Sequence, residues 1–246
     1  YTFTPMDNSI NPFQSSDGVL DAQSLSTPRA FVANVFSYMS LALIISGVMS
    51  WWFGTTDLVY YLIGKGGPTA LGWVTMFAPL GFVLAMNFGF NRMSLPVLIG
   101  VFLSFAAVMG ISLSYIFLIY SLDVIAKVFF ITSALFATMA VIGYTTKTDL
   151  TRLGSLLMMA LIGLIIASLV NYFMESERLD YIISCVGVLI FTGLIAYDTQ
   201  KVKRIGAGVE YGTATAGKLA IMGATSLYLD FINLFLFLLR IFGRRD

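Results

Sequence analysis

The sequence predicts an all-α integral membrane protein built as a bundle of seven transmembrane helices. Of its 246 residues, 58% are hydrophobic and only 11% are charged, and the mean hydropathy is +0.88. Soluble domains carry roughly 25% charged residues, so this composition cannot cover a water-exposed surface. The chain also holds seven apolar segments, each near the roughly 20 residues that a helix needs to cross a bilayer. The lipid bilayer is therefore its first expected partner.

The chain divides into a polar N-terminal segment and a membrane domain. Residues 1–28 are rich in Ser, Asn, Asp and Pro and are expected to form a flexible polar tail. Residues 29–246 form the transmembrane domain. Between the third and fourth apolar segments, Asp123 and Lys127 are expected to mark a short turn. The expected spans are about 31–53, 69–88, 95–118, 124–145, 153–173, 181–200 and 218–241.

Basic residues beside the spans predict the orientation, because Lys and Arg gather on the cytoplasmic side of membrane proteins. Eight flank the spans on one side and six on the other, which favours the N-terminus inside and the C-terminus outside. The first group is Arg29, Arg92, Lys147, Arg152, Lys201, Lys203, Arg204 and Lys218.

Composition also excludes several kinds of function. The chain has no His, which removes Ser-His-Asp catalysis, His metal sites and His proton relays. The single Cys185 excludes an intramolecular disulfide and a cysteine metal cage. A net charge of +1 argues against a nucleic-acid partner. We expect no cofactor and no enzymatic activity.

Two aspartates lie where lipid would surround them. Asp230 stands well inside the last apolar segment, and Asp198 lies in the final turn of the sixth. A charged Asp at a helix centre costs about 2.5–3.5 kcal/mol on insertion scales, so it must be neutralised, paired or hydrated. Gly223, Ser226, Asp230 and Asn233 recur at spacings of 3, 4 and 3, which places them on one polar stripe of the helix.

Structural roles are the alternative for both carboxyls. A protonated Asp230 could do no more than hydrogen-bond to a neighbouring helix. Asp198, close to Lys201, could equally be a solvated helix end. An ionisable group inside the membrane is nevertheless a candidate functional residue by default, so Asp230 in particular is treated as one.

Three stretches resemble one family of membrane proteins. "GYTTKTDL" (143–150), "FTGLIAYDTQKVK" (191–203) and "LYLDFINLFLFLLRIFG" (227–243) are similar to motifs of the Bax inhibitor-1, or transmembrane Bax inhibitor motif, family. The resemblance covers about residues 29–243 and is closest to bacterial members. The combination of the three stretches makes it specific.

The resemblance implies a bundle in which the last helix is central and is ringed by the other six. It implies a pH-sensitive calcium leak channel of the bacterial inner membrane, in which Asp198 and Asp230 share a hydrogen bond that senses pH. Arg92 is the basic candidate to lie against this pair, and Ser226 and Asn233 are expected to support it. Calcium, which prefers oxygen ligands, would bind Asp198 and Asp230 transiently as the permeant ion, in competition with protons.

The helix lengths put one condition on this pairing. Asp198 lies about three residues before the basic cluster that starts at Lys201, whereas Asp230 lies twelve after Lys218. At 1.5 Å per residue these depths differ by roughly 13 Å if both helices end at the same level. Contact therefore requires the seventh helix to project inward or the sixth to end deeper.

Two other functions fit this sequence less well than a channel, and a third is a stronger alternative. A retinal protein needs a lysine in the middle of the last helix, where this chain has Asp230. An intramembrane aspartyl protease fits only in part, because "AYD" occurs at 196–198 but Asp230 follows "SLYL". The stronger alternative is a non-conducting regulatory protein that binds other membrane proteins, such as a membrane protease, through the polar tail or the inner connection 201–218.

Overall fold

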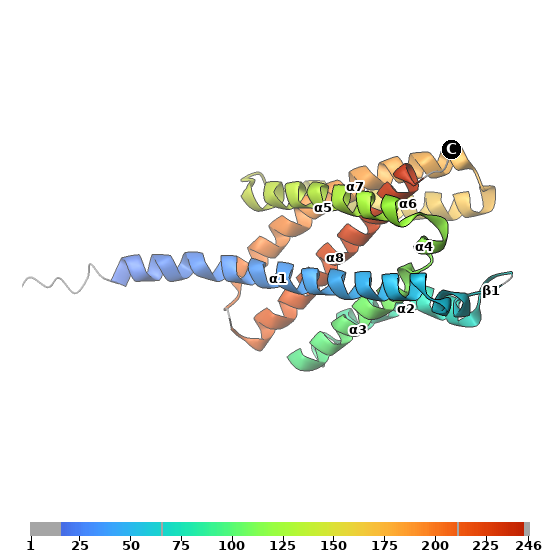
Figure 1. Cartoon of the computed structure of the whole chain (residues 1–246). Coiled ribbons are helices and arrows are strands. Elements are labelled where there is room, and N and C mark those ends of the chain that lie inside the picture. The colour runs from blue at the N-terminus through green and yellow to red at the C-terminus, as the bar shows by residue number, and fades with distance from the viewer. Residues whose placement is uncertain (1–15, 65, 211, 244–246) are drawn as a thin grey trace, which may run out of the picture.

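The computed structural model describes residues 16–64, 66–210 and 212–243 (Figure 1). In this part of the chain it is an all-α protein, as the sequence predicts, and it also has one short β-hairpin that the sequence prediction does not include. The elements are α1 (Ser16–Thr55), η1 (Asp57–Tyr61), β1 (Ile63–Gly64), β2 (Gly67–Pro68), α2 (Ala70–Gly89), α3 (Leu95–Leu113), α4 (Ile116–Ile119), α5 (Leu122–Thr145), α6 (Thr151–Met174), α7 (Glu177–Gly208) and α8 (Ala214–Phe242).

Seven candidate membrane spans are found among the described residues, which confirms the predicted number. The third combines α3 and α4 into Leu95–Ile119. The sequence prediction that Asp123 and Lys127 mark a turn after this span is wrong. Asp123 and Lys127 lie inside α5, where they form a 3.2 Å ion pair one helical turn apart. An acidic residue in the first turn stabilises a helix N-terminus, so these charges begin α5 rather than interrupt the chain.

The first helix is longer than its apolar segment. α1 begins at Ser16, while its part that is apolar enough to cross a membrane is Pro28–Thr55. The second half of the expected tail is therefore helical, and residues 1–15 lie outside the described residues.

Hydroxyl side chains cap three helices. The side chains of Thr69, Ser176 and Thr213 accept hydrogen bonds from backbone N–H groups three residues later, at the starts of α2, α7 and α8. Such caps satisfy a donor that a helix N-terminus leaves free. They separate α6 from α7 and α7 from α8 at defined residues.

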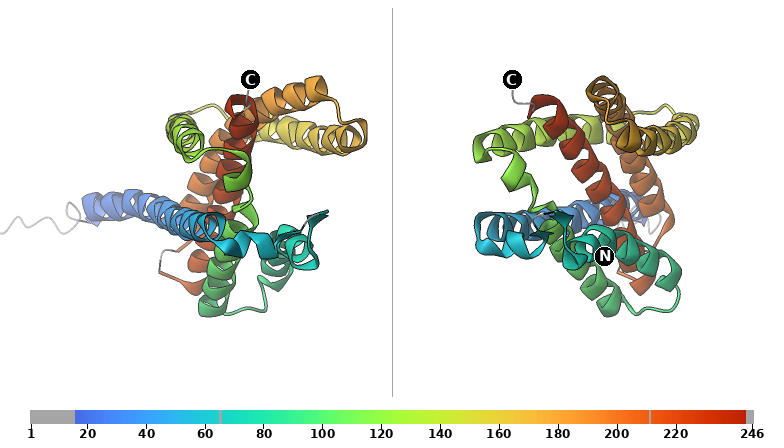
Figure 2. Two further views of the ribbon diagram at one scale, coloured as in Figure 1. Left: turned by 45° about the vertical axis from the view of Figure 1, so that its right-hand side comes forward. Right: turned by 90° about the vertical axis from the view of Figure 1, so that its right-hand side faces the viewer.

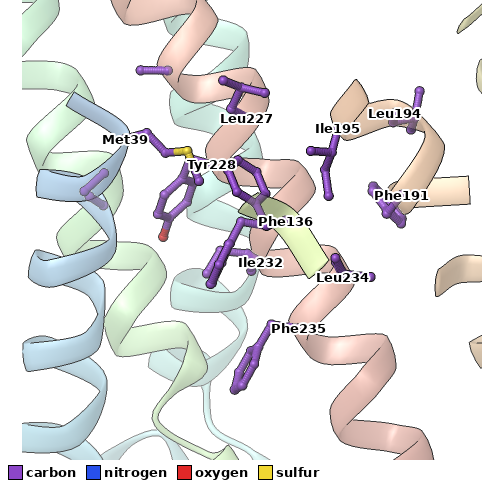
Figure 3. Packing of buried hydrophobic residues seen from close by; sticks show 14 of the residues in the cluster. Met39, Phe136, Phe191, Leu194, Ile195, Leu227, Tyr228, Ile232, Leu234 and Phe235 are labelled. Carbon is purple, nitrogen blue, oxygen red and sulfur yellow. The ribbon is translucent and has the colours of Figure 1, made fainter. Parts of the chain in front are cut away.

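α8 is the central helix of the bundle. It contacts α1, α2, α3, α5 and α7, and in Figure 2 it runs through the middle of the fold in red. Of its most apolar window 67% is buried, against 11% for α6, which packs on α7 at the periphery. Figure 3 shows Tyr228 reaching from α8 toward α1, where its hydroxyl and Ser46 Oγ form a 2.6 Å hydrogen bond.

The bundle has two different ends. We call the end with the connections 90–94, 146–150 and 209–213 the basic end, and the end with η1, β1 and β2 the hairpin end. At the basic end α7 continues to Gly208, eight residues beyond the expected end of its span. This end of α7 holds the α5–α6 connection and the neighbouring end of α5. Gln200 Nε2 donates to Thr148 O at 2.8 Å, and Lys203 Nζ donates to Tyr144 O at 2.7 Å.

Candidate functional site

The polar stripe of α8 is buried against α7. Asp230 is only 6% exposed, and its Oδ2 has no hydrogen-bond partner among the described residues. Asn233 Nδ2 donates to Leu229 O at 2.8 Å, so its amide stays tied to its own helix. Ser226, one turn before Asp230, is partly buried and faces α7.

Asp198 comes to this stripe from α7. It is 9% exposed, and it lines one cavity together with Ser226 and Asp230. Among the described residues, Asp198 and Asp230 are the buried acidic side chains. Both helices continue toward the basic end beyond the expected limits of their spans, because α7 ends at Gly208 rather than near residue 200 and α8 begins at Ala214 rather than at residue 218.

Two cavities meet at these carboxyls. The α6–α8 cavity has a volume of about 420 Å³, lies among α6, α7 and α8, and is lined by both Asp198 and Asp230. The α2–α8 cavity has a volume of about 210 Å³ and lies among α2, α7 and α8, toward the basic end. Asp198, Ser226 and Leu229 line both cavities and thus stand between them.

Lys201 is the basic group beside the pair, and the sequence prediction did not include it in the site. It lines the α2–α8 cavity and interacts electrostatically with both Asp198 and Asp230. Its spacing of three residues from Asp198 on a helix was the available signal, since such residues share a face. Because the sequence prediction ends this span near residue 200, it treats Lys201 as a charge that flanks the membrane and not as part of the site.

Arg92 is not brought to the pair. It is exposed in the α2–α3 connection, where its backbone N–H donates to Gly89 O at 2.9 Å. It lines neither of the two cavities at the carboxyls.

Two ion pairs lie at the helix ends, away from Asp198 and Asp230. Arg240 of α8 lies 3.7 Å from Asp180 of α7 at the hairpin end. Arg204 pairs with Asp149 at the basic end. Among the described residues, no group of three or more His, Cys, Asp or Glu side chains could hold a metal ion.

These features define a polytopic α-helical membrane protein with a buried pair of acidic side chains between its last two helices. The chain belongs to the Bax inhibitor-1 family: the family described as "Inhibitor of apoptosis-promoting Bax1" matches residues 28–246.

Bacterial relatives are similar over nearly their whole length. The "Uncharacterized protein RP147" of Rickettsia prowazekii is 46% identical over 220 residues, which is 88% of this chain and 90% of the relative. The "Inner membrane protein YbhL" of Escherichia coli K12 is 38% identical over 229 residues, covering 91% and 97%. A protein of Borreliella burgdorferi is 39% identical over 225 residues, covering 92% and 96%.

Proposed function

We propose that this protein is a pH-sensitive calcium leak channel of the bacterial inner membrane, gated by protonation of Asp198 and Asp230. The observation that carries the proposal is that these buried carboxyls, from α7 and α8, line the same cavity. Two findings support a location in the inner membrane: the chain belongs to this family of membrane proteins, and one relative is named as an inner membrane protein.

The gate rests on a shared proton. Two carboxylates side by side in a dry site repel each other, so a single proton between them forms an O–H···O⁻ hydrogen bond that joins α7 to α8. The pair then takes up and releases protons as one unit. Loss of the shared proton replaces attraction by repulsion, which allows α8 to move against α7.

Calcium would use the same oxygens. Deprotonated Asp198 and Asp230 offer the carboxylate ligands that calcium prefers, and Ser226 and Asn233 add polar groups to the lining of the α6–α8 cavity. An ion that arrives from the basic end would pass through the α2–α8 cavity, which Asn87 and Lys201 line. The protonated state is closed in this mechanism, and the deprotonated state is permeable.

The test is calcium flux into liposomes that contain only the purified protein. Calcium entry should rise with pH for the wild type, and Asp230→Asn should lose most of this pH response because a neutral amide cannot release the proton. Asp123→Asn is the matched control, since Asp123 is an exposed aspartate at the start of α5. An unchanged pH response in both Asp198→Asn and Asp230→Asn removes the mechanism. Absence of any flux favours the non-conducting regulatory role.

A further inference from the structure

A buried hydroxyl of α1 lacks the partner that similar hydroxyls in this fold have. Ser and Thr side chains in the spans commonly donate to the carbonyl four residues earlier, as Ser46 does to Ala42 O and Thr132 to Val128 O, each at 2.7 Å. Ser50 follows Ser46 by one turn and is 5% exposed, yet its Oγ has no hydrogen-bond partner among the described residues. A buried donor without an acceptor is costly, which points to an acceptor from outside the chain.

Ser50 lines a cavity that is distinct from the two at the aspartates. This third cavity has a volume of about 270 Å³ and lies among four spans, namely α1, α3 with α4, α5 and α8. Its walls are apolar, with Phe129 from α5 and Phe235 from α8 among them. An apolar cavity of about 150 Å³ already stays dry and binds benzene, so this one accommodates hydrocarbon. Gly47 lines this cavity without filling it, because glycine has no side chain and a Cβ at that position would meet nothing within 4 Å.

The cavity opens onto the face of the bundle that lipid covers. Two of its lining residues, Trp51 and Phe130, are 55% and 71% exposed, and both belong to membrane-spanning helices. Ser50 stands five residues before the end of α1 at Thr55, which is roughly 7.5 Å along the helix axis. Trp51 and Trp52 beside it are residues that gather at the membrane–water interface. The hydroxyl therefore lies near the edge of the hydrocarbon layer, at the depth of the ester groups of a lipid.

We propose that this cavity binds one acyl chain of a glycerol-ester phospholipid, and that the Ser50 hydroxyl donates a hydrogen bond to the ester carbonyl of that chain. The apolar walls hold the first part of the chain, and Ser50 fixes its polar end. The site requires neither the aspartate pair nor calcium flux, so a failure of the channel proposal would leave this proposal unchanged.

Photolabelling of the purified full-length protein in phosphatidylethanolamine–phosphatidylglycerol vesicles tests the site. The probe is phosphatidylglycerol with a diazirine on its acyl chain, in an ester-linked and an ether-linked form, and the labelled peptides are mapped by mass spectrometry. The ester probe should label the cavity walls in α5 and α8. Gly47→Leu fills the cavity and should reduce this labelling to background. Gly163→Leu is the control, because Gly163 is also free of close contacts but lies on an exposed face of α6.

The hydroxyl is tested by the difference between the two probes. Ser50→Ala keeps the cavity and should lower ester-probe labelling by about two- to tenfold, the effect of one neutral hydrogen bond, while leaving ether-probe labelling unchanged. Each variant must melt as the wild type does, and Gly47→Ala, with a partial loss of labelling, replaces Gly47→Leu if the larger side chain prevents folding. Equal labelling in the wild type, Gly47→Leu and Gly163→Leu means ordinary surrounding lipid and overturns the proposal. Equal response of both probes to Ser50→Ala overturns the assigned hydrogen bond.

Discussion

Asp198 and Asp230 place two ionisable groups between the largely apolar helices α7 and α8. Both are buried, and the charge that interacts with them is that of Lys201, three residues after Asp198. A nearby positive charge favours the ionised form of a carboxyl. Lys201 would therefore help the pair to release its proton, although as a cation beside the α2–α8 cavity it also opposes the approach of calcium.

Replacing Lys201 should separate these two effects. In Lys201→Met the midpoint of pH-dependent calcium entry should move to higher pH, since the loss of a neighbouring opposite charge makes the carboxyls harder to ionise. Flux at saturating pH should not fall. Lys147→Met, in the exposed α5–α6 connection, is the control. A midpoint that stays where it is would show that Lys201 does not act on the pair.

At the scale of elements, α7 is held in place by close helix contacts and by its basic end. Gly143 of α5 touches the backbone of Ala196 on α7, two residues before Asp198: a Cβ at Gly143 would lie 2.8 Å from Ala196 Cα. Small residues let helices approach this closely in a membrane, where no hydrophobic force drives them together. The close contact between α5 and α7 therefore explains why the "GYTTKTDL" stretch begins with a glycine.

Gly143→Ala should destabilise the bundle. The added methyl group overpacks the α5–α7 contact, at a cost of about 1–3 kcal/mol, and should lower the apparent Tm in detergent. Gly163→Ala adds the same group in open space and should be neutral or stabilising by up to about 1 kcal/mol. Equal Tm changes in the two variants would contradict the contact.

The basic end of α7 adds a pH-dependent contact outside the membrane. Hydrogen bonds from the Thr151 side chain and from Arg204, together with the Thr151 backbone N–H, hold the pKa of Asp149 well below its usual range. A lowered folded-state pKa gives stability that is present above the unfolded pKa of about 3.9 and is lost as pH falls below it.

The difference in Tm between wild type and Asp149→Asn should therefore be constant near neutral pH and should begin to shrink below about pH 4. Thermal melts over a pH series measure it. A difference that is the same at every pH would mean that Asp149 contributes through shape rather than through charge.

The same elements show what the sequence could and could not predict. Seven spans follow from hydropathy alone, because lipid exposure leaves α6 apolar on nearly all sides. Hydropathy detects only the part of a helix that is apolar enough to lie in the membrane. It therefore does not predict the polar turns that continue α7 to Gly208 and begin α1 at Ser16. Lys201 was missed for that reason. The cavity at Ser50 was beyond prediction because it depends on packing among four helices.

For the whole molecule, the fold places Asp198 and Asp230, the two buried acidic side chains of the described residues, at the junction of α7 with the central helix, and its basic connections at one end. The count of basic residues beside the spans predicts that this end faces the cytoplasm. With seven spans, the hairpin end and the C-terminus then lie on the other side.

Cysteine accessibility in intact cells tests this orientation. In a Cys185→Ser background, Asp57→Cys in η1 should react with a membrane-impermeant maleimide added outside, because Asp57 is exposed at the hairpin end. Lys147→Cys at the basic end should react only after the cells are opened. The reverse pattern would invert the topology.

The central claim is that Asp198 and Asp230 act as one proton-binding unit that controls calcium flux. Its most direct test is a double-mutant cycle on the pH dependence of calcium entry into liposomes, with Asp198→Asn, Asp230→Asn and the double variant. Each single substitution should abolish most of the pH response, and the double variant should lose no more than either single one, because one shared proton is removed in every case. Losses that add up independently, or a pH response in the double variant as large as that of the wild type, would contradict the claim.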